Sequence, residues 1–267
     1  MENNQPNQGQ EGIAKTDDGV FNKYHVIVKS FIIFILLLIF IIPQIFTSEL
    51  IRERENNQEA AFIDISEKWS GRQTITGPIM AVPYLEYYRD TNRVLRYTKH
   101  HLYFLPEKLD FKTQILPEKR HRNIYEVVVY NSTINVEASF EKINLKNLNI
   151  PKENILWNEA NIILGLTDMR GIKEKLEMKF DNTTFQFNPG VVSRDIFESG
   201  AVAPLSIDSV DSFLSSGHSL VLNIDLKGSE KMFFVPVGKT TTVNMKSVWQ
   251  TPAFNGQFLP ESSVVDA

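Results

Sequence analysis

The feature that most constrains this chain is an uninterrupted run of large apolar residues from Phe31 to Ile42. The surrounding segment, residues 26–46, has about the 20 residues that a helix needs to cross a bilayer. A cleaved signal peptide would require a small-residue cleavage site, which the following sequence TSELIRER does not offer. A buried helix of a soluble domain would rarely contain such a run. We therefore predict a transmembrane helix over residues 26–46.

Two polar segments flank this helix. Residues 1–19 contain hardly any apolar side chain and cannot offset the entropy of ordering, so residues 1–25 are predicted to form a disordered leader. Residues 47–70 are predicted to form a helical stalk, because apolar residues including Phe62, Ile65 and Trp69 recur at helical spacing. Lysine and arginine are balanced on the two sides of the membrane segment, so the positive-inside rule does not orient it.

Beyond Trp69 the sequence changes to short runs rich in β-branched and aromatic residues, separated by breaks that contain glycine or proline. In the run NSTINVEASFE apolar and polar residues alternate, as expected for a strand with one buried face. Eight or more such runs with few helices predict an antiparallel β-sandwich, with residues 71–267 as one β-rich domain. The expected strands are Ile79 to Tyr88, His100 to Leu105, Asn123 to Phe140, Asn161 to Leu166, Leu176 to Phe187, Ser219 to Leu226, Lys231 to Val237 and Thr241 to Trp249.

Charge and composition exclude several classes of function. The formal net charge is -4 and the sequence pI is about 5.8, which does not suit a nucleic-acid-binding surface. The chain has no cysteine, so thiolate chemistry, disulfides and cysteine-ligated metals are excluded. The adjacent His100 and His101 point to opposite faces of a predicted strand and cannot both bind one ion. No phosphate-binding loop or nucleophile elbow is present. We predict no metal, no cofactor and no enzymatic activity.

The motif GPIMAVPY contains the first candidate positions. Gly77 and Pro78 are expected to turn the chain at this point. Pro83 cannot donate a ladder hydrogen bond, so the strand is expected to be short or to lie at a sheet edge.

The motif LTDMRGI contains the second candidate positions. Asp168 and Arg170 are two residues apart and therefore lie on one face of an extended chain, with Gly171 free to take a positive φ. The pair is either a functional site or a charged pair that secures a turn at the end of a strand. The structural interpretation is favoured.

Taken together, these stretches resemble the CreD family of bacterial inner-membrane proteins, which is named for the Cre two-component regulon and associated with colicin tolerance. The resemblance lies in the N-terminal membrane helix and six motifs in collinear order over nearly all of the chain. The motifs are IRERENNQ, TGPIMAVPY after Gln73, YFLPEKL, RNIYEV, LTDMRGI and WQTPAFNGQFLP. The family-pattern positions are Gly77, Pro78, Asp168, Arg170, Gly171, Trp249, Pro252, Phe254, Gly256 and Pro260.

The resemblance implies a cytoplasmic amino terminus, a periplasmic β-rich domain, and further membrane helices near the carboxyl end. It implies no catalytic residues, so the motif positions are expected to be structural. The sequence has no second apolar run long enough to span a membrane. The chain is therefore expected to be an N-terminal portion or a truncated form, with residues 71–267 incomplete at their C-terminal end.

The leading hypothesis is a non-enzymatic inner-membrane protein that serves envelope integrity or stress response. Its expected partners are the lipid bilayer and an unidentified membrane or envelope protein. An alternative is a membrane-anchored binding module whose sheets enclose a lipid or a cell-wall fragment. A hydrolase is a third possibility, for which no nucleophile, base and orienting group can be assembled from the sequence.

Overall fold

The computed structural model describes residues 18–145, 148–193 and 196–262, and the chain divides into two compact units, residues 1–58 and 59–267. The first unit contains most of helix α1 (Asp18–Lys68), which also passes through the predicted stalk. The predicted disordered leader lies largely outside the described residues. Its last part does not fit the prediction, because the helix begins at Asp18, ahead of Val26.

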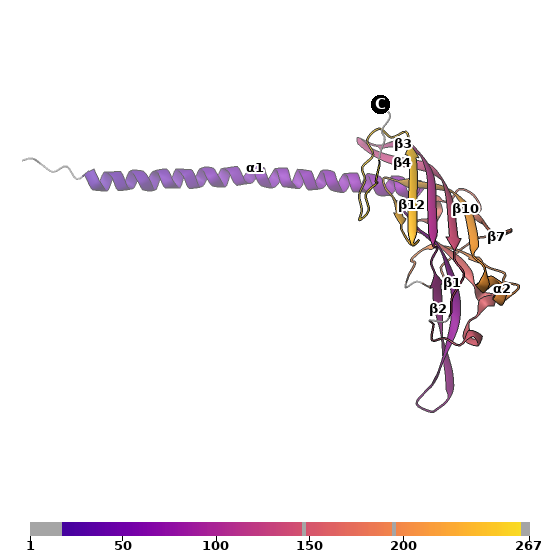
Figure 1. Ribbon diagram of the computed structural model, residues 1–267. Helices are drawn as coiled ribbons and strands as arrows, with labels where there is room; N and C mark the ends of the chain where they lie inside the picture. Colours follow the sequence, from indigo (N-terminus) through magenta and orange to yellow (C-terminus); the bar gives the residue numbers. More distant parts are fainter. Residues whose placement is uncertain (1–17, 146–147, 194–195, 263–267) are drawn as a thin grey trace, which may run out of the picture. The chain divides into compact units, whose positions relative to one another are not determined.

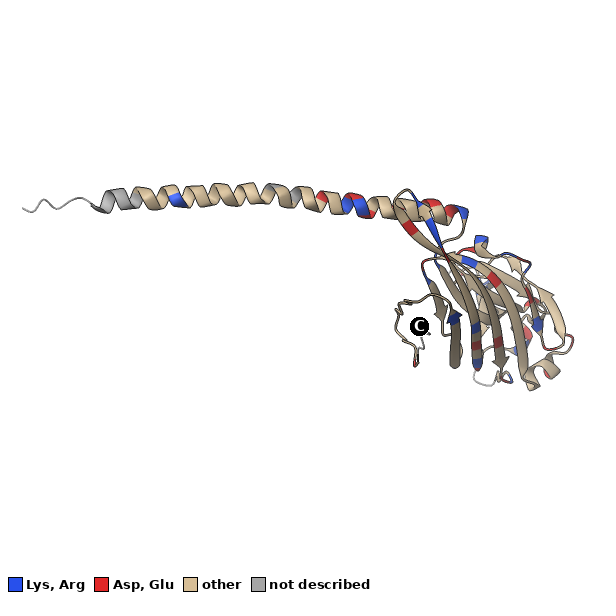
Figure 2. Ribbon diagram, turned by 90° about the horizontal axis from the view of Figure 1, so that it is seen from above, with Lys and Arg blue, Asp and Glu red and all other residues tan. Residues whose placement is uncertain are grey.

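The apolar stretch of α1 has the properties of a membrane segment. None of the described residues in its most apolar window is buried in the protein, and Phe40 is 74% exposed. A helix on the surface of a soluble domain would bury one apolar face, whereas a helix that is apolar all round belongs in lipid. Figure 2 shows that this stretch has almost no charged residues and that charged residues return after it. Residues 26–46 are thus helical and lie in a helix that is long and apolar enough to cross a membrane.

The second unit contains two six-stranded sheets (Figure 1). The first sheet has the order β11-β1-β5-β9-β8, and β2 also pairs with β1; the second has the order β12-β3-β4-β10-β6-β7. The first consists of β1 (Gln73–Arg89), β2 (Leu95–Phe104), β5 (Asn161–Leu166), β8 (Asn188–Pro189), β9 (Gly200–Pro204) and β11 (Met232–Val235). The second consists of β3 (Lys108–Arg122), β4 (Tyr125–Phe140), β6 (Glu177–Phe180), β7 (Thr183–Gln186), β10 (His218–Ser229) and β12 (Thr240–Ser247). The short helices are η1 (Lys152–Asn154), η2 (Trp157–Glu159), η3 (Met169–Gly171) and α2 (Val210–Ser215).

The two sheets share one apolar core, as expected for a sandwich. Met80 and Ile162 of the first sheet belong to the same buried cluster as Phe111 and Leu222 of the second. The alternation predicted for NSTINVEASFE is confirmed, because Ile134, Val136, Ala138 and Phe140 are all buried. The mainly β fold is therefore confirmed. The sheets are mixed, since β1 pairs with β11 and β3 pairs with β12 in parallel.

Strand β1 differs from its prediction, because it is long and central. It runs through Gly77 and Pro78, which are joined by a cis peptide bond, and its register with β5 shifts between Thr76 and Ile79. It has β5 on one side and β11 followed by β2 on the other. Pro83 is tolerated because its pairing with β5 has already ended at Ala81. Beyond the end of β5, the Pro83 carbonyl accepts a hydrogen bond from the Leu156 N–H at 2.8 Å.

Strand β3 was not among the predicted strands. It contains Pro117 and the basic run around His121, and it pairs with β4 along its whole length. Pro117 lies beyond Ile115, where the pairing with β12 ends, so β3 has one neighbouring strand at that point. A proline is tolerated where a strand has a neighbour on one side only.

Candidate functional site

A buried glutamine at the start of β1 is the centre of a polar cluster that joins distant parts of the chain. The Gln73 side chain is completely buried. Its Nε2 donates to the Ser70 Oγ at 2.8 Å, to the Asp168 carbonyl at 2.9 Å and to the Lys227 carbonyl at 3.1 Å. Its Oε1 accepts from the Asp168 N–H at 3.2 Å. One amide therefore holds together the first strand, the turn before η3 and the end of β10.

Serine side chains extend this network to the end of α1. The Ser229 hydroxyl donates to the Ser70 carbonyl at 2.7 Å, and the Ser66 and Ser229 hydroxyl oxygens lie 3.1 Å apart. All three serines are buried. We refer to this group as the Gln73 cluster, and its members are Ser66, Ser70, Gln73, Asp168, Arg170, Gly171 and Ser229.

Asp168 and Arg170 lie at the rim of the cluster. The Asp168 carboxylate accepts from the Arg170 backbone N–H at 3.0 Å and pairs with the Arg170 guanidinium at 2.8 Å. The same carboxylate accepts from the Gly71 N–H at 3.1 Å. The hydrogen bond from Arg170 holds the pKa of Asp168 well below its ordinary value, although partial burial acts in the opposite direction. The pair secures η3 at the end of β5, which agrees with the structural interpretation.

Gly171 fits the cluster because it has no side chain. A Cβ atom at this position would lie 2.4 Å from the Lys227 carbonyl oxygen and 2.5 Å from the Gln73 Nε2. Gly171 is not among the glycines with positive φ, so it does not use the conformational freedom that the sequence offers at this position. Close approach of the backbone is the reason for the glycine.

The last turns of α1 pack against the second sheet next to the Gln73 cluster. Phe62, with Ile65 and Trp69 beside it, lies in an apolar cluster with Val127 and Val129 of β4. Both Arg120 and Lys227 place a cation within about 5 Å of the Trp69 ring, a distance at which cation–π attraction acts. The packing stripe predicted for this part of the stalk is confirmed.

The remaining predicted positions do not join the cluster. Gly77 has a φ of 101° and lies with Pro78 at the register shift between β1 and β5. The residues of the last motif follow β12 in a segment without regular structure, where most are exposed; these are Trp249, Pro252, Phe254, Gly256 and Pro260. Trp249 contributes one long-range contact, because the Lys119 ammonium lies 5.7 Å from its ring centroid.

The histidines do not form a metal site. In the part of the chain that the structure describes, no group of three or more His, Cys, Asp or Glu side chains could hold a metal ion. His100 stacks on Tyr84, and His101 lies near Tyr103. His218 is buried, and its ring nitrogens lie 2.7 Å from an Asp181 carboxylate oxygen and 2.8 Å from the Phe213 carbonyl oxygen.

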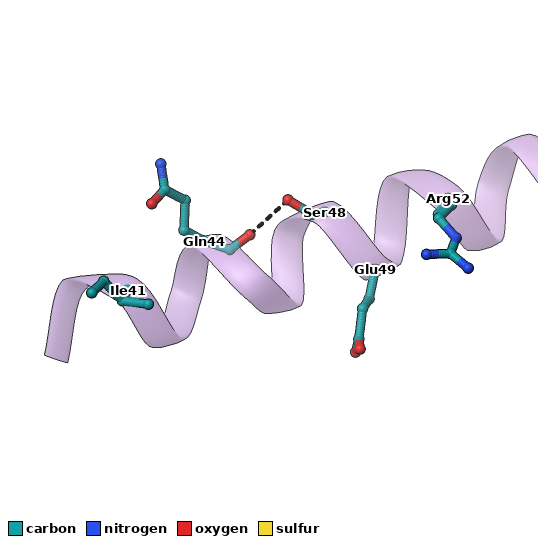
Figure 3. Close-up of a pocket in the computed structure, with 5 residues that line it drawn as sticks. All are labelled: Ile41, Gln44, Ser48, Glu49 and Arg52. Atoms are coloured by element: carbon teal, nitrogen blue, oxygen red, sulfur yellow. Dashed lines mark hydrogen bonds between the residues drawn. The ribbon is translucent and has the colours of Figure 1, made fainter. Parts of the chain in front are cut away.

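A shallow hollow on α1 is also no binding pocket. It is lined by Ile41, Gln44, Ser48, Glu49 and Arg52, all from one helix (Figure 3). The Ser48 hydroxyl donates to the Gln44 carbonyl at 2.9 Å, which leaves this serine bonded within its own helix. A single helix offers one wall and cannot enclose a ligand.

The Gln73 cluster acts as a clamp, because its polar groups join segments of the same chain to one another. Its carbonyl, hydroxyl and amide groups bond one another, and the Asp168 carboxylate is neutralised by Arg170. Sequence reasoning found Asp168, Arg170 and Gly171 but not the serines or the role of Gln73. The available signal was the position of Gln73 directly before the TGPIMAVPY motif.

The pKa of Asp168 leads to an expected pH dependence. The pKa of Asp168 is lower in the folded chain than its ordinary value of 3.8. Its carboxylate therefore stabilises the fold at pH values above 3.8, and this contribution is lost as the pH falls through the pKa of the folded chain. We expect Asp168→Asn to be less stable than the natural chain by about 1 to 3 kcal/mol at neutral pH. We also expect this difference to shrink below about pH 4. Urea unfolding of the full chain in detergent, followed by tryptophan fluorescence, measures both.

Asp208 is exposed and has no ion pair among the described residues, so it provides the matched control. Asp208→Asn is expected to change the unfolding free energy by less than about 0.5 kcal/mol. An Asp168→Asn difference that stays constant down to acid pH would contradict the assignment to the carboxylate.

The fold and the cluster together define a class: a mainly β sandwich that follows an N-terminal helix long and apolar enough to cross a membrane. A family model described as "Inner membrane protein CreD" matches residues 25–267, and the chain belongs to this family. The inner membrane protein CreD of Escherichia coli (strain K12) is 26% identical over 227 residues, which cover 84% of this chain and 49% of that protein. The chain thus spans about half the length of the curated relative that it matches. No solved structure matches significantly.

Proposed function

We propose that this CreD-family protein is a non-enzymatic envelope protein with a cytoplasmic amino terminus and a periplasmic β domain. In this proposal the β domain serves envelope integrity or stress response by contact with other membrane or envelope components. The family membership supports the inner-membrane setting. The balance of charges around the membrane helix does not orient it, so the side of the domain needs its own measurement.

The observation that carries the proposal is the construction of the Gln73 cluster. Its most polar groups bond segments of the same chain and secure the end of α1 against both sheets. A catalytic group would instead be presented to a cleft, with a base and an orienting partner. The space between the sheets is filled by buried apolar side chains from both. These features favour contact through the outer surface over a ligand enclosed between the sheets.

Cysteine labelling in intact cells tests the side of the β domain. The chain has no cysteine, so an introduced one reports without background. We expect Thr91→Cys, in the exposed β1–β2 turn, to react with a membrane-impermeant maleimide before lysis. Ser132→Cys is the matched control, because Ser132 is 3% exposed and is expected to react only after unfolding. Labelling of Thr91→Cys only after permeabilisation would place the domain in the cytoplasm and overturn the proposed topology.

Photo-crosslinking tests the proposed contact with envelope components. Strand β12 lies at the end of the second sheet, and its Met245 side chain is 42% exposed. Strands at sheet edges are common places for pairing with other chains. We expect a photo-reactive residue at position 245 to give adducts with membrane or envelope proteins in intact cells, and one at position 132 to give none. If neither position gave crosslinked adducts, this result would count against contact at this edge.

A further inference from the structure

The distal part of the β1–β2 hairpin extends beyond the sandwich. Pairing of β1 with β5 ends at Ala81, whereas pairing with β2 continues to Arg89. Figure 1 shows the two strands and their turn projecting from the other strands of the β domain. We define the hairpin tip as residues 86–98. Its side chains are exposed, apart from the partly buried Asp90.

Tyrosines are exposed on both faces of the hairpin tip. Tyr87 lies opposite Tyr97, with ring centroids 6.1 Å apart, and Tyr88 lies opposite Arg96. Because successive residues of a strand point to opposite faces, Tyr88 lies on the other face from the Tyr87–Tyr97 pair. The three tyrosines are 48%, 48% and 62% exposed, in chain order. Neither face of the tip is covered by the rest of the described domain.

The turn of the tip contains an arginine in a conformation that arginine does not favour. Arg93 has a φ of 60°, and its N–H donates to the Asp90 carbonyl at 2.8 Å. This left-handed position in a hairpin turn is usually occupied by glycine or asparagine, and another residue is strained there. Asn123, Asp181 and Glu230 hold the equivalent conformation elsewhere in this domain. The conformation of the turn therefore does not itself require arginine at position 93.

The cations at the tip are only partly neutralised. Asp90 accepts from the N–H groups of Asn92 and Val94 and pairs with Arg96 at 2.9 Å, so its charge is used within the turn. The hydrogen bond from Arg96 holds the pKa of Asp90 below its ordinary value. Among the described residues, Arg89 and Arg93 have no carboxylate partner. The Arg89 guanidinium donates to the Arg93 carbonyl at 3.2 Å. The tip thus carries three arginines against two carboxylates, Glu86 and Asp90, and projects from a chain whose net charge is -4.

We propose that the hairpin tip docks on the surface of an anionic phospholipid bilayer. Tyrosine side chains favour the interface between headgroups and hydrocarbon, and arginines near an anionic surface are attracted to it. An acidic protein would cover one face of the hairpin, whereas headgroups surround an inserted tip on both faces. The tyrosines on both faces therefore favour a lipid surface. Arg93 supplies charge at the outermost turn, and this role accounts for its strained conformation.

This inference rests on the proposed function, from which it takes the membrane setting of the β domain. It deepens that function by naming one envelope component that the β domain contacts. Its test uses the purified full chain and does not depend on which side of the membrane the domain occupies. Failure of lipid docking would leave the topology experiment and the contact at β12 untouched, so the two failures are distinguishable.

The test places an environment-sensitive fluorophore, NBD, on Thr91→Cys in the full chain, reconstituted in nanodiscs. One set of discs contains phosphatidylglycerol and phosphatidylcholine, and the other contains phosphatidylcholine alone. Vesicles of the same two compositions are then added. We expect a blue shift and quenching by headgroup nitroxide lipids with anionic lipid only, weakened by salt. A response in the discs identifies the bilayer that holds α1, and a response only to vesicles identifies a facing bilayer.

Variants assign the response to the tip arginines. Arg93→Gly and Arg89→Ser are each expected to weaken docking roughly fivefold, as loss of one cation near an anionic surface predicts. Arg93→Gly should leave the stability of the chain unchanged or raised, because glycine suits the turn, so weaker docking cannot be ascribed to unfolding. Lys246→Ser, which removes an exposed cation of β12, is the control and should dock normally. No response in either lipid, or an equal response in neutral lipid, would overturn the proposal.

Discussion

Gln73→Glu is expected to destabilise the β domain more than any surface substitution, by about 3 to 5 kcal/mol at neutral pH. The change keeps the shape of the side chain but replaces its donor with a second acceptor. The new carboxylate would face the carbonyl oxygens of Asp168 and Lys227, which Nε2 approaches at 2.9 and 3.1 Å. Because the site is completely buried, water cannot compensate. Urea unfolding of the full chain, followed by tryptophan fluorescence, measures the loss.

The pH dependence of this variant separates the hydrogen-bond explanation from a loss of packing. Burial beside carbonyl oxygens raises the pKa of the introduced carboxyl, so its cost is present above the folded pKa and decreases as pH falls toward the ordinary range of glutamate. The gap to the natural chain should therefore narrow in acid. Gln114→Glu makes the same change at an exposed position of β3 and should have little effect. Equal stabilities of the two variants would show that the Gln73 amide does not hold the cluster.

The general fold could be predicted from the sequence because its signals are local. An apolar run indicates a membrane helix whatever surrounds it, and residues 161–166 were predicted as a strand with the bounds that β5 has. The predictions that were wrong concern residues whose conformation depends on strands that are distant in the sequence. A proline within a strand suggests a break, yet Pro83 and Pro117 each lie where one of the two neighbouring strands has ended. Sequence alone does not show where a neighbour ends.

The candidate site could be predicted only in part, for the same reason. The Asp168–Arg170 pair is local, so its turn-securing role followed from the spacing. The partners of Gln73 are remote, because Asp168 and Lys227 lie 95 and 154 residues away in the sequence. A single glutamine carries no mark of such contacts. Gly171 was recognised as a motif residue, but the close approach that requires it became visible only in the fold.

Gly171→Ala is the second substitution with a large expected effect, a loss of about 2 to 4 kcal/mol in unfolding free energy. The added methyl would overlap the Lys227 carbonyl oxygen at 2.4 Å and the Gln73 Nε2 at 2.5 Å. Neither atom can move freely, because the two are hydrogen bonded to each other at 3.1 Å. The methyl would therefore separate η3 from the end of β10 and open the clamp. Thermal and urea unfolding of the full chain in detergent measure this loss.

Gly71→Ala is the matched control, because Gly71 lies beside the same cluster but has room for a methyl. Its Cβ would meet Asp168 Oδ2 at 3.9 Å, which is an ordinary contact. We expect a change within about 0.5 kcal/mol, since alanine also lowers the entropy of the unfolded chain. If the Gln73 cluster holds the end of α1 rigidly against both sheets, Gly171→Ala must lose more unfolding free energy than Gly71→Ala. If Gly171→Ala were as well tolerated as Gly71→Ala, the backbone around Lys227 would be free to shift, and the cluster would not be the rigid clamp described above.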